Sequence, residues 1–547
     1  MKLRHFYGAV AICWASLFLL VASGWAQEAV NPFRIGLPQD WTQRHIIFSR
    51  DGLQSHPELV GKEPRIAHSA MQRWRSTRPD FNAAGSTVNL AAPQRDWNVT
   101  MGGRLAANMF PAKYSFDPAA APDCTNDYVV FALNVAGLTG GRANFVGFNN
   151  LYVGAGGLCG AGPAPNTMFA YNTTTVGAGR IATSPILSAD GKKIAFVETG
   201  ATSSVFHVLT WASGAGTIAA SVVPASMTSL TYAAAAPNTR SSPWVDYTTD
   251  TAYVGADDGK IYKITGVFKG TPALAGGIWP ITVSANIRVT APVLDNRLGL
   301  VLVGSQNGTF YSINTTSGVV KSLVVGRSGG TNPGILAAPI VDVTNGTSFV
   351  VSSNDGTSGV LVEVDTATMT ELAKGRVGIA SKSGTAISLY EPAFSNDYYN
   401  DPTTGVVRLC GTGNVADISP WQYAFGGFTL VGGKFVMNTT PVFSAQLLTS
   451  TAARCTGWTE FFNPNVGAAP GTDFFFFGLT ADCTGPGTSG CVVARNSDLS
   501  VNTADVTGGP SGIVVDNFST AGQASSIYLT GFRAPNLALK FTQNGLN

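Results

Sequence analysis

The sequence predicts an all-β protein that folds as a single β-propeller. Three observations support this prediction: a strand-like motif that returns about every 50 residues, polar-glycine turns inside the copies, and the composition. Units of short strands at this period are typical of propeller blades. Glycine is abundant, with 63 residues, and only 12% of residues are charged, so Lys and Glu, which favour surface helices, are scarce.

The repeat is clearest between residues 183 and 353. Its copies read TSPILSADGKKIAFVET (183–199), SSPWVDYTTDTAYVGAD (241–257), TAPVLDNRLGLVLVGSQ (290–306) and AAPIVDVTNGTSFVVSS (337–353). Weaker copies lie at 143–157, 390–412, 440–451 (continuing at 473–480) and 510–531. The prolines that open the copies, from Pro185 to Pro441, are 58, 49, 47, 53 and 49 residues apart. These copies favour eight blades, with seven longer blades as the alternative.

Each blade is expected to contain about four strands. The first is the apolar run after the proline, where a missing N–H breaks no ladder bond. The third follows an Asp-Gly or Asn-Gly turn, as in GKIYKI (259–264) and GTFYSI (308–313), because these pairs suit hairpins. A fourth is less clear, with 319–325 as a candidate. The last copy shows only three runs, so DYVVFALNV (127–135) is expected to supply its outer strand and close the ring.

The N-terminal part of the chain differs from the repeats. Residues 1–26 have a charged start, an apolar run and the small residues Gly24 and Ala26, which predicts a secretory signal peptide. Residues 27–122 are interpreted as an extension with a short amphipathic helix at 64–77 and a linker at 82–93. The propeller is assigned to 123–547. No later run is long and apolar enough to span a bilayer, so we expect no transmembrane segment in the mature chain.

Six cysteines remain after the predicted signal is removed. An even number in an exported chain favours disulfides over free thiols, and no CxxC spacing indicates a metal site. Cys483 and Cys491 flank a short loop and are the first expected pair. The natural remaining pairs are Cys124 with Cys159 and Cys410 with Cys455.

The repeats resemble those of quinoprotein-like propellers, including the lipoprotein propeller of bacterial outer-membrane assembly. The residues that carry the resemblance are SSPWVDYTTDTAYVGADDGKIYKI (241–264) and VGSQNGTFYSINTTSG (303–318). The resemblance covers residues 140–370 best and implies a bacterial, exported protein. For related dehydrogenases it implies pyrroloquinoline quinone and Ca²⁺ as cofactors. This chain departs from those enzymes, because GVVKSL (318–323) lacks the tryptophan that locks their blades and no Cys-Cys pair is present. We therefore predict no cofactor and keep these two as the alternative.

Residues suited to catalysis are few. Of the five histidines only His207 lies in the predicted propeller, within an alternating strand that favours a structural role. Asp257, Asp258 and Asp355 occupy polar-glycine turns and are weak candidates for Ca²⁺, but Asp and Gly also suit the turn itself. The recurrent Asp246, Asp295 and Asp342 favour a shared structural hydrogen bond.

Aromatic clusters give a similar choice. The run from Phe474 to Phe477 predicts a strand buried on both faces, with a carbohydrate platform as the alternative. The catalytic and cofactor-binding residues are not identified by any motif.

These features favour a secreted or periplasmic propeller that acts as a non-enzymatic binding or scaffolding module for a protein or a glycan. A net charge of +2 without a basic segment argues against nucleic acid. The first alternative is a quinoprotein-like oxidoreductase. The second is a carbohydrate-active propeller that uses paired carboxylates near the central channel.

Overall fold

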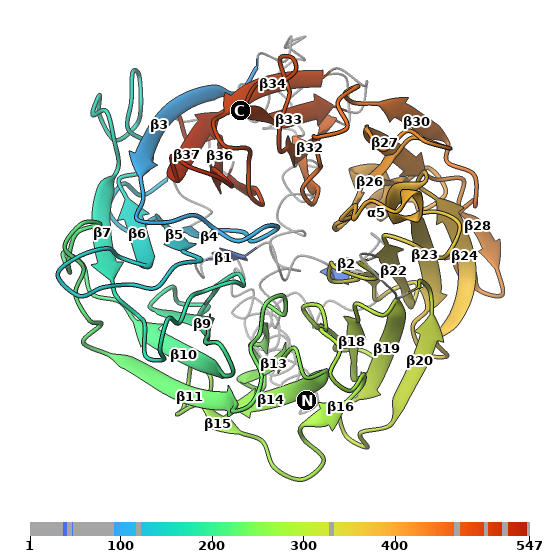
Figure 1. The fold of residues 1–547 in the computed structure, drawn as a ribbon, viewed down its shortest axis with the longest axis horizontal. Coiled ribbons are helices and arrows are strands. Elements are labelled where there is room, and N and C mark those ends of the chain that lie inside the picture. The colour runs from blue at the N-terminus through green and yellow to red at the C-terminus, as the bar shows by residue number, and fades with distance from the viewer. Residues whose placement is uncertain are drawn as a thin grey trace, which may run out of the picture.

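The fold is described from a computed structural model. It describes residues 37–40, 46–47, 92–115, 122–327, 333–463, 471–496, 501–516 and 523–543. Eight antiparallel sheets follow one another around a central channel, which confirms the predicted propeller and its eight blades (Figure 1). The predicted signal peptide, the helix at 64–77 and the linker up to residue 91 lie outside the described residues.

The first four blades have their strands in chain order from the channel outward, except that β15 and β16 share the outer edge of blade 3. Blade 1 contains β4 (Ala112–Ser115), β5 (Tyr128–Ala132), β6 (Phe145–Asn149) and β7 (Asn166–Tyr171). Blade 2 contains β8 (Ile186–Leu187), β9 (Lys193–Thr199), β10 (Ser204–Thr210) and β11 (Met227–Ala233). Blade 3 contains β12 (Trp244–Asp246), β13 (Thr251–Gly255), β14 (Lys260–Thr265), β15 (Ala273–Leu274) and β16 (Ile281–Thr282). Blade 4 contains β17 (Val293–Asp295), β18 (Leu300–Gly304), β19 (Thr309–Asn314) and β20 (Val320–Val324).

The next three blades continue the same order. Blade 5 contains β21 (Ile340–Asp342), β22 (Thr347–Ser352), β23 (Val360–Asp365) and β24 (Thr370–Arg376). Blade 6 contains β25 (Ala393–Phe394), β26 (Val407–Thr412), β27 (Pro420–Phe425) and β30 (Phe443–Gln446). Blade 7 contains β31 (Thr459–Asn463), β32 (Thr472–Leu479), β33 (Gly490–Asn496) and β34 (Val501–Val506).

Blade 8 closes the ring with strands from both ends of the described chain. Its inner strands are β35 (Val514–Asp516), β36 (Ser526–Thr530) and β37 (Leu537–Thr542), and β3 (Gln94–Thr100) is the outer strand. Figure 1 shows β3 in blue beside β37 in red. The expectation that 127–135 closes the ring was wrong, because β5 is the second strand of blade 1. Strands β3 and β4 also extend the ring into residues that the sequence had assigned to the extension.

Two of the weaker copies were placed out of phase. The inner strand of blade 1 is β4, which follows Pro111, so the copy at 143–157 contains the third strand and not the first. Pro441 precedes β30, an outer strand that pairs with β27. The inner strand of blade 7 is β31, which has no proline before it. A proline suits the edge of a sheet on either side, which explains the error at Pro441. The copy at 143–157 has no proline to mark its phase.

Several short elements add to the blades. Strand β1 (Leu37–Asp40) pairs with β4, and β2 (Ile46–Ile47) pairs in parallel with β21, both on the channel side (Figure 1). A hairpin of β28 (Thr429–Val431) and β29 (Lys434–Val436) is inserted in blade 6. A 3-10 helix, η4 (Ala380–Ser383), and a short helix, α5 (Asn396–Asn400), flank the inner strand of the same blade. The predicted turn glycine Gly259 has a φ of 77°, which a side chain would strain.

The core lies between neighbouring blades, where both faces of each sheet are covered. The run from Phe474 to Phe477 in β32 shows this directly, since all four rings are buried. Phe474 and Phe476 pack with blade 8, whereas Phe475 and Phe477 pack toward blade 6. The side chains of one strand point alternately to its two faces, so burial leaves no aromatic surface here for a carbohydrate.

Three disulfides are present, and they are the pairs expected from the sequence. They join Cys124 to Cys159, Cys410 to Cys455 and Cys483 to Cys491. Such bonds form and persist in oxidising compartments. Among the described residues, no helix has the length and hydrophobicity needed to cross a membrane.

Candidate functional site

A pocket lies at the mouth of the central channel, where the inner strands begin. It has a volume of about 190 Å³ and is lined by 106–110, Ala182, Thr183, Thr239, Arg240, Ser242, Ala291, Leu336, Ala338, Ser388, Tyr390 and Glu391. These residues come from the entrances of blades 1 to 6, so the pocket lies near the axis of the ring. We call it the channel-mouth pocket. A cavity of about 150 Å³ holds benzene in an engineered protein, so this one has room for a small molecule.

Hydrogen bonds between the entrances of neighbouring blades fix the wall of the pocket. The Phe110 N–H donates to Ser184 Oγ at 2.9 Å, and the Ser184 N–H donates to Ser242 Oγ at 3.0 Å. These contacts connect blades 1, 2 and 3 around the channel. Serine suits this position because its hydroxyl accepts a hydrogen bond from the neighbouring entrance.

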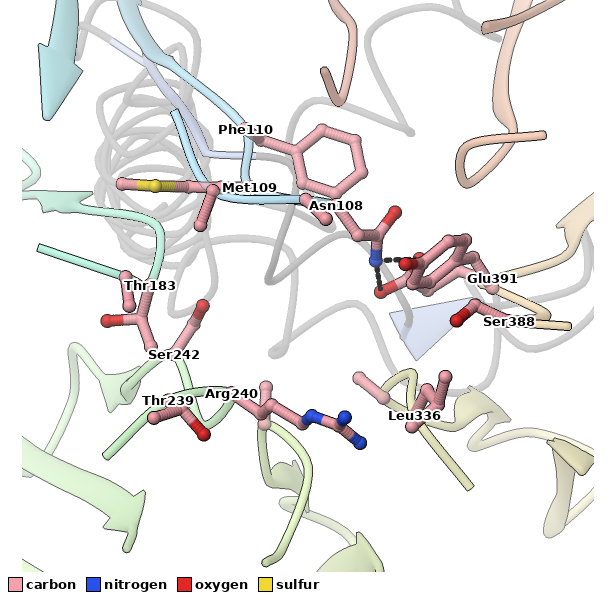
Figure 2. Close-up of a pocket in the computed structure, with 16 residues that line it drawn as sticks. Asn108, Met109, Phe110, Thr183, Thr239, Arg240, Ser242, Leu336, Ser388 and Glu391 are labelled. Carbon is pink, nitrogen blue, oxygen red and sulfur yellow. Dashed lines mark hydrogen bonds between the residues drawn. The ribbon is translucent and has the colours of Figure 1, made fainter. Parts of the chain in front are cut away.

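Arg240 extends into the pocket from the entrance of blade 3 (Figure 2). Its loop is held by Asn238, whose Oδ1 accepts the N–H groups of Arg240 and Ser241 at 3.2 and 2.8 Å. Asn238 Nδ2 donates to the Ser241 carbonyl at 2.7 Å, which closes the same turn. In the described part of the chain, the buried Nη1 of Arg240 has no hydrogen-bond partner. The guanidinium is therefore positioned by its backbone with one donor unused.

Burial lowers the pKa of Arg240, and the nearby charge of Arg288 lowers it further, whereas Tyr390 and Asp257 act in the opposite direction. A guanidinium stays protonated in proteins despite such shifts. The pocket therefore contains a permanent positive charge in a partly desolvated position, where it attracts an anion more strongly than it would in water.

Glu391 supplies a negative charge on another side of the pocket (Figure 2). Asn108 Nδ2 donates to both of its carboxylate oxygens, at 2.8 and 2.6 Å, and Asn108 Oδ1 accepts the Gly457 N–H at 3.1 Å. Asn108 has a φ of 57°, a conformation that asparagine tolerates better than most residues. A Cβ on Gly457 would lie 2.5 Å from Glu391 Oε2, so glycine makes room for the carboxylate.

Hydroxyl groups complete the polar lining. Thr183 is 2% exposed, and its Oγ1 is a second buried atom without a hydrogen-bond partner among the described residues. Burial raises the pKa of Tyr390, although Ser388 and Arg240 act to lower it. The Tyr390 hydroxyl is consequently a neutral hydrogen-bonding group at neutral pH.

The structure does not bring the three sequence-predicted metal candidates together. Asp257 Oδ1 accepts the N–H and the hydroxyl of Thr239, both at 3.1 Å, and Arg288 Nε lies 3.2 Å from Asp257 Oδ2. Asp257 thus supports the loop that carries Arg240 instead of lining the pocket. Asp258 accepts the Lys260 N–H within its own hairpin, at 3.0 Å.

Asp355 is equally occupied by its own turn, in a different blade. It accepts the N–H groups of Thr357 and Ser358, at 2.8 and 2.9 Å. Burial alone would raise the pKa of Asp355, but the hydrogen bonds from Thr357 and Ser358 lower it. Within the described ranges, no group of three or more His, Cys, Asp or Glu residues is placed to hold a metal ion.

The recurrent aspartates after the inner strands have a structural role. Asp246, Asp295 and Asp342 each accept an N–H from the turn that follows, at 2.9 Å in all three cases. The position recurs because these three blades have the same turn after the inner strand.

His207 is buried within blade 2 and away from the channel-mouth pocket. Its Nε2 lies 3.0 Å from Glu198 Oε2, and its Nδ1 lies 2.9 Å from Ser229 Oγ. Burial alone would raise the pKa of Glu198, but hydrogen bonds from His207, Thr175 and Val176 lower it. Through these two contacts His207 connects β9, β10 and β11 inside one sheet.

Two carboxyl groups, Asp473 and Glu460, lie close together inside blade 7. Burial and the neighbouring Glu460 raise the pKa of Asp473 well above its usual value, and Asp473 Oδ2 accepts the Asn396 N–H at 2.8 Å. Neither carboxyl group lines the channel-mouth pocket. The pair therefore lacks the access to substrate that paired carboxylates need in a glycosidase.

Sequence reasoning missed Arg240, Glu391, Asn108 and Thr183. A signal was available in the residue before each opening proline, which is serine or alanine in four copies, at 184, 242, 291 and 338. In the copy at 390–412 that residue is Glu391. A charged residue at a repeat position that is otherwise small marks a place where the copies differ for a reason beyond packing.

The pocket does not fit pyrroloquinoline quinone, the cofactor implied by the quinoprotein resemblance. That molecule carries three carboxylates, whereas the pocket offers one guanidinium and one opposing carboxylate.

No family model and no curated protein matches the chain. Among solved structures, BamB from Moraxella catarrhalis shares 13% identity over 76% of this chain and 98% of that one, with a TM-score of 0.46. The Dos1 propeller shares 9% identity over 82% and 95%, with a TM-score of 0.49. The dihydro-heme d1 dehydrogenase NirN shares 12% identity over 77% and 74%, with a TM-score of 0.42. The propeller assignment rests on the strand pairing, and these likenesses add no functional argument.

Proposed function

We propose that this protein is an exported, non-enzymatic binding module that holds a small polar ligand, free or presented by a protein or glycan, in the channel-mouth pocket. The observation that carries the proposal is the Arg240 guanidinium, which faces the pocket with Nη1 unpartnered among the described residues. A buried donor without a partner costs free energy, and a bound ligand removes that cost.

The chemistry of the lining supports binding more than catalysis. Arg240 keeps its proton, burial raises the pKa of the Tyr390 phenol, and Asn108 contacts both oxygens of Glu391. General acid–base catalysis favours a pKa near 7, whereas Arg240 stays protonated and the pKa of Tyr390 is raised further from that value. Polar groups fixed in a concave site are what ligand recognition requires.

The predicted signal at 1–26 and the three disulfides support a secreted or periplasmic location. Expression of the full chain in a bacterium with a periplasm tests this part of the proposal. The protein recovered from the periplasm should begin at Gln27 by mass spectrometry. Recovery in the cytosol with Met1 and reduced cysteines would contradict export.

Ligand binding is tested by thermal-shift screening of a library of sugars, sugar acids, amino acids and short peptides. Ala291→Phe should fill the pocket and abolish the shift that the wild type shows with its ligand. Ala219→Phe, at an exposed position outside the pocket, is the matched control and should retain the shift. Binding that survives Ala291→Phe would overturn the proposal. Turnover of a substrate, including dye reduction with added pyrroloquinoline quinone and Ca²⁺, would overturn its non-enzymatic part.

A further inference from the structure

The channel-mouth pocket contains two buried polar atoms that lack a hydrogen-bond partner among the described residues. They are Arg240 Nη1 at the entrance of blade 3 and Thr183 Oγ1 at the entrance of blade 2. Most buried polar atoms in proteins are paired, so two unpaired atoms on one cavity define what an occupant must supply. At Arg240 the occupant must supply a hydrogen-bond acceptor for a cationic donor. At Thr183 it must supply a group that forms a hydrogen bond with a hydroxyl.

The acceptor at Arg240 is best provided by a carboxylate. Guanidinium and carboxylate groups match in geometry, and charge-assisted bonds are roughly twice as strong as neutral ones. The negative charge of Glu391 on the same pocket disfavours ligands of higher charge, such as phosphate esters, because like charges repel in a desolvated site.

The remaining lining favours a ligand that carries hydroxyl groups. Thr183, Ser242, Ser388 and Tyr390 all place hydroxyl-bearing side chains on the pocket, and a hydroxyl both donates and accepts. A partner hydroxyl meets either requirement at Thr183 Oγ1. A purely apolar acid would leave that atom buried and unpaired.

We infer that the channel-mouth pocket binds a hydroxylated monocarboxylate of the sugar-acid class, with the carboxylate on Arg240 and a ring or chain hydroxyl on Thr183. This inference rests on the proposed binding function and specifies its ligand. The sugar acid is either free or the terminal uronate of a glycan, since both present the same chemistry.

Isothermal titration calorimetry with D-galacturonate and its neutral counterpart D-galactose tests the carboxylate. Galacturonate should bind at least tenfold more tightly than galactose to the wild type, since a hydrogen bond between charged groups is stronger than one between neutral groups. A trigalacturonate probe distinguishes the sources: tighter binding than the monomer indicates a glycan terminus, and weaker binding indicates the free acid. Equal affinity for galacturonate and galactose would overturn the inference, as would tighter binding of galactose 6-phosphate.

Substitutions at Arg240 and Thr183 test the two proposed contacts with the ligand. Arg240→Met should weaken galacturonate binding more than tenfold and leave galactose unchanged, whereas Arg240→Lys should fall between, because lysine lacks the planar fork. Thr183→Val keeps the shape of the side chain and should weaken both sugars several-fold. Arg376→Met, on the exposed end of outer strand β24, is the matched control and should bind as the wild type does.

The same variants separate a binding role from a structural one. Removing a guanidinium with an unpaired buried donor should leave the melting temperature of Arg240→Met equal to or above that of the wild type. A large loss of stability would indicate that Arg240 supports the fold and would overturn the assignment. If sugar acids do not bind but another ligand does, and Ala291→Phe blocks that ligand, only the ligand class is rejected. Failure of every library member rejects the proposed binding function itself.

Discussion

Asn345 in blade 5 forms two hydrogen bonds with the backbone of Phe435 in blade 6. Its Nδ2 donates to the Phe435 carbonyl and its Oδ1 accepts the Phe435 N–H, both at 2.8 Å. Lys434 Nζ adds bonds to the carbonyls of Asn345 and Gly346, at 3.1 and 3.0 Å. These contacts hold the β28–β29 hairpin of one blade against its neighbour.

Asn345→Ala should release this hairpin. Both bonds to Phe435 are lost, at a cost of about 1–3 kcal/mol, and the loss should be local because Phe435 and Val436 are only partly buried where they pack against the core. Hydrogen exchange of the amides at 434–437 should accelerate, with the amides of β22 and β23 unchanged. Asn345→Asp keeps the acceptor and should show a smaller effect. Unchanged exchange at Phe435 in both variants would contradict the role of Asn345.

Ring closure should depend on Asp96. This residue lies in a β-bulge of the outer strand β3 and accepts hydrogen bonds from Lys540 and, at 2.6 Å, from Thr542. Asp96→Ala leaves the buried Lys540 ammonium unpaired, so the free energy of unfolding should fall by about 3–5 kcal/mol. Denaturant titration measures it. Asp96→Ala combined with Lys540→Met should recover part of the loss. If the double variant is no more stable than the single one, the cost arises elsewhere in the strand.

The three disulfides should differ in their contribution to stability. Cys410 and Cys455 are 45 residues apart, whereas Cys483 and Cys491 are 8 apart. A longer loop loses more entropy in the unfolded chain, so removing the first bond should cost about 1.5 kcal/mol more than removing the second. Paired Cys→Ala variants compared by urea unfolding provide the measurement. The Trp458 Nε1 contact with Cys410 Sγ, at 3.3 Å, is lost with the first bond and adds to its cost. An equal or reversed order would therefore contradict the argument from loop length.

Glu363 should make stability depend on pH. Burial raises the pKa of Glu363 to about 8, and the charge of Asp342 also raises it. The Met437 N–H and the charge of Lys434 lower this pKa in part. A carboxyl group whose pKa is raised on folding contributes stability that is fully present below its unfolded pKa, near 4.5, and is lost as the pH rises through about 8.

Glu363→Gln should remove this dependence. As the pH rises from 5 to 8, the free energy of unfolding of the variant should increase relative to that of the wild type by on the order of 3 kcal/mol. Melting temperatures across that range provide the measurement. Asp342, whose pKa burial raises to about 6, contributes a separate slope that both proteins retain. Parallel pH profiles for the two proteins would contradict the assignment to Glu363.

The sequence by itself determined the architecture of this protein. Proline-led apolar runs, Asp-Gly and Asn-Gly turns and an even cysteine count are local signals, because each reflects the backbone or side-chain requirements of one short segment. The strand and turn signals recur in most copies of the repeat, so the eight blades were predicted. The even cysteine count and the spacing of the cysteines predicted the three pairings. Where a copy lost its proline, as before β31, or gained one before β30, the phase of the repeat was assigned wrongly.

The tertiary structure alone decided which residues meet at the channel mouth. Asn108, Thr183, Arg240 and Glu391 lie far apart in the chain and belong to four different blades. Only Glu391 stands out within the repeat, and no short segment shows that a charge is unpaired or that a hydroxyl is buried. Those properties depend on how eight sheets close around one axis, which brings the inner-strand entrances of blades 1 to 6 to the same place. The ring follows from the repeated pattern, and the pocket follows from the few residues that depart from it.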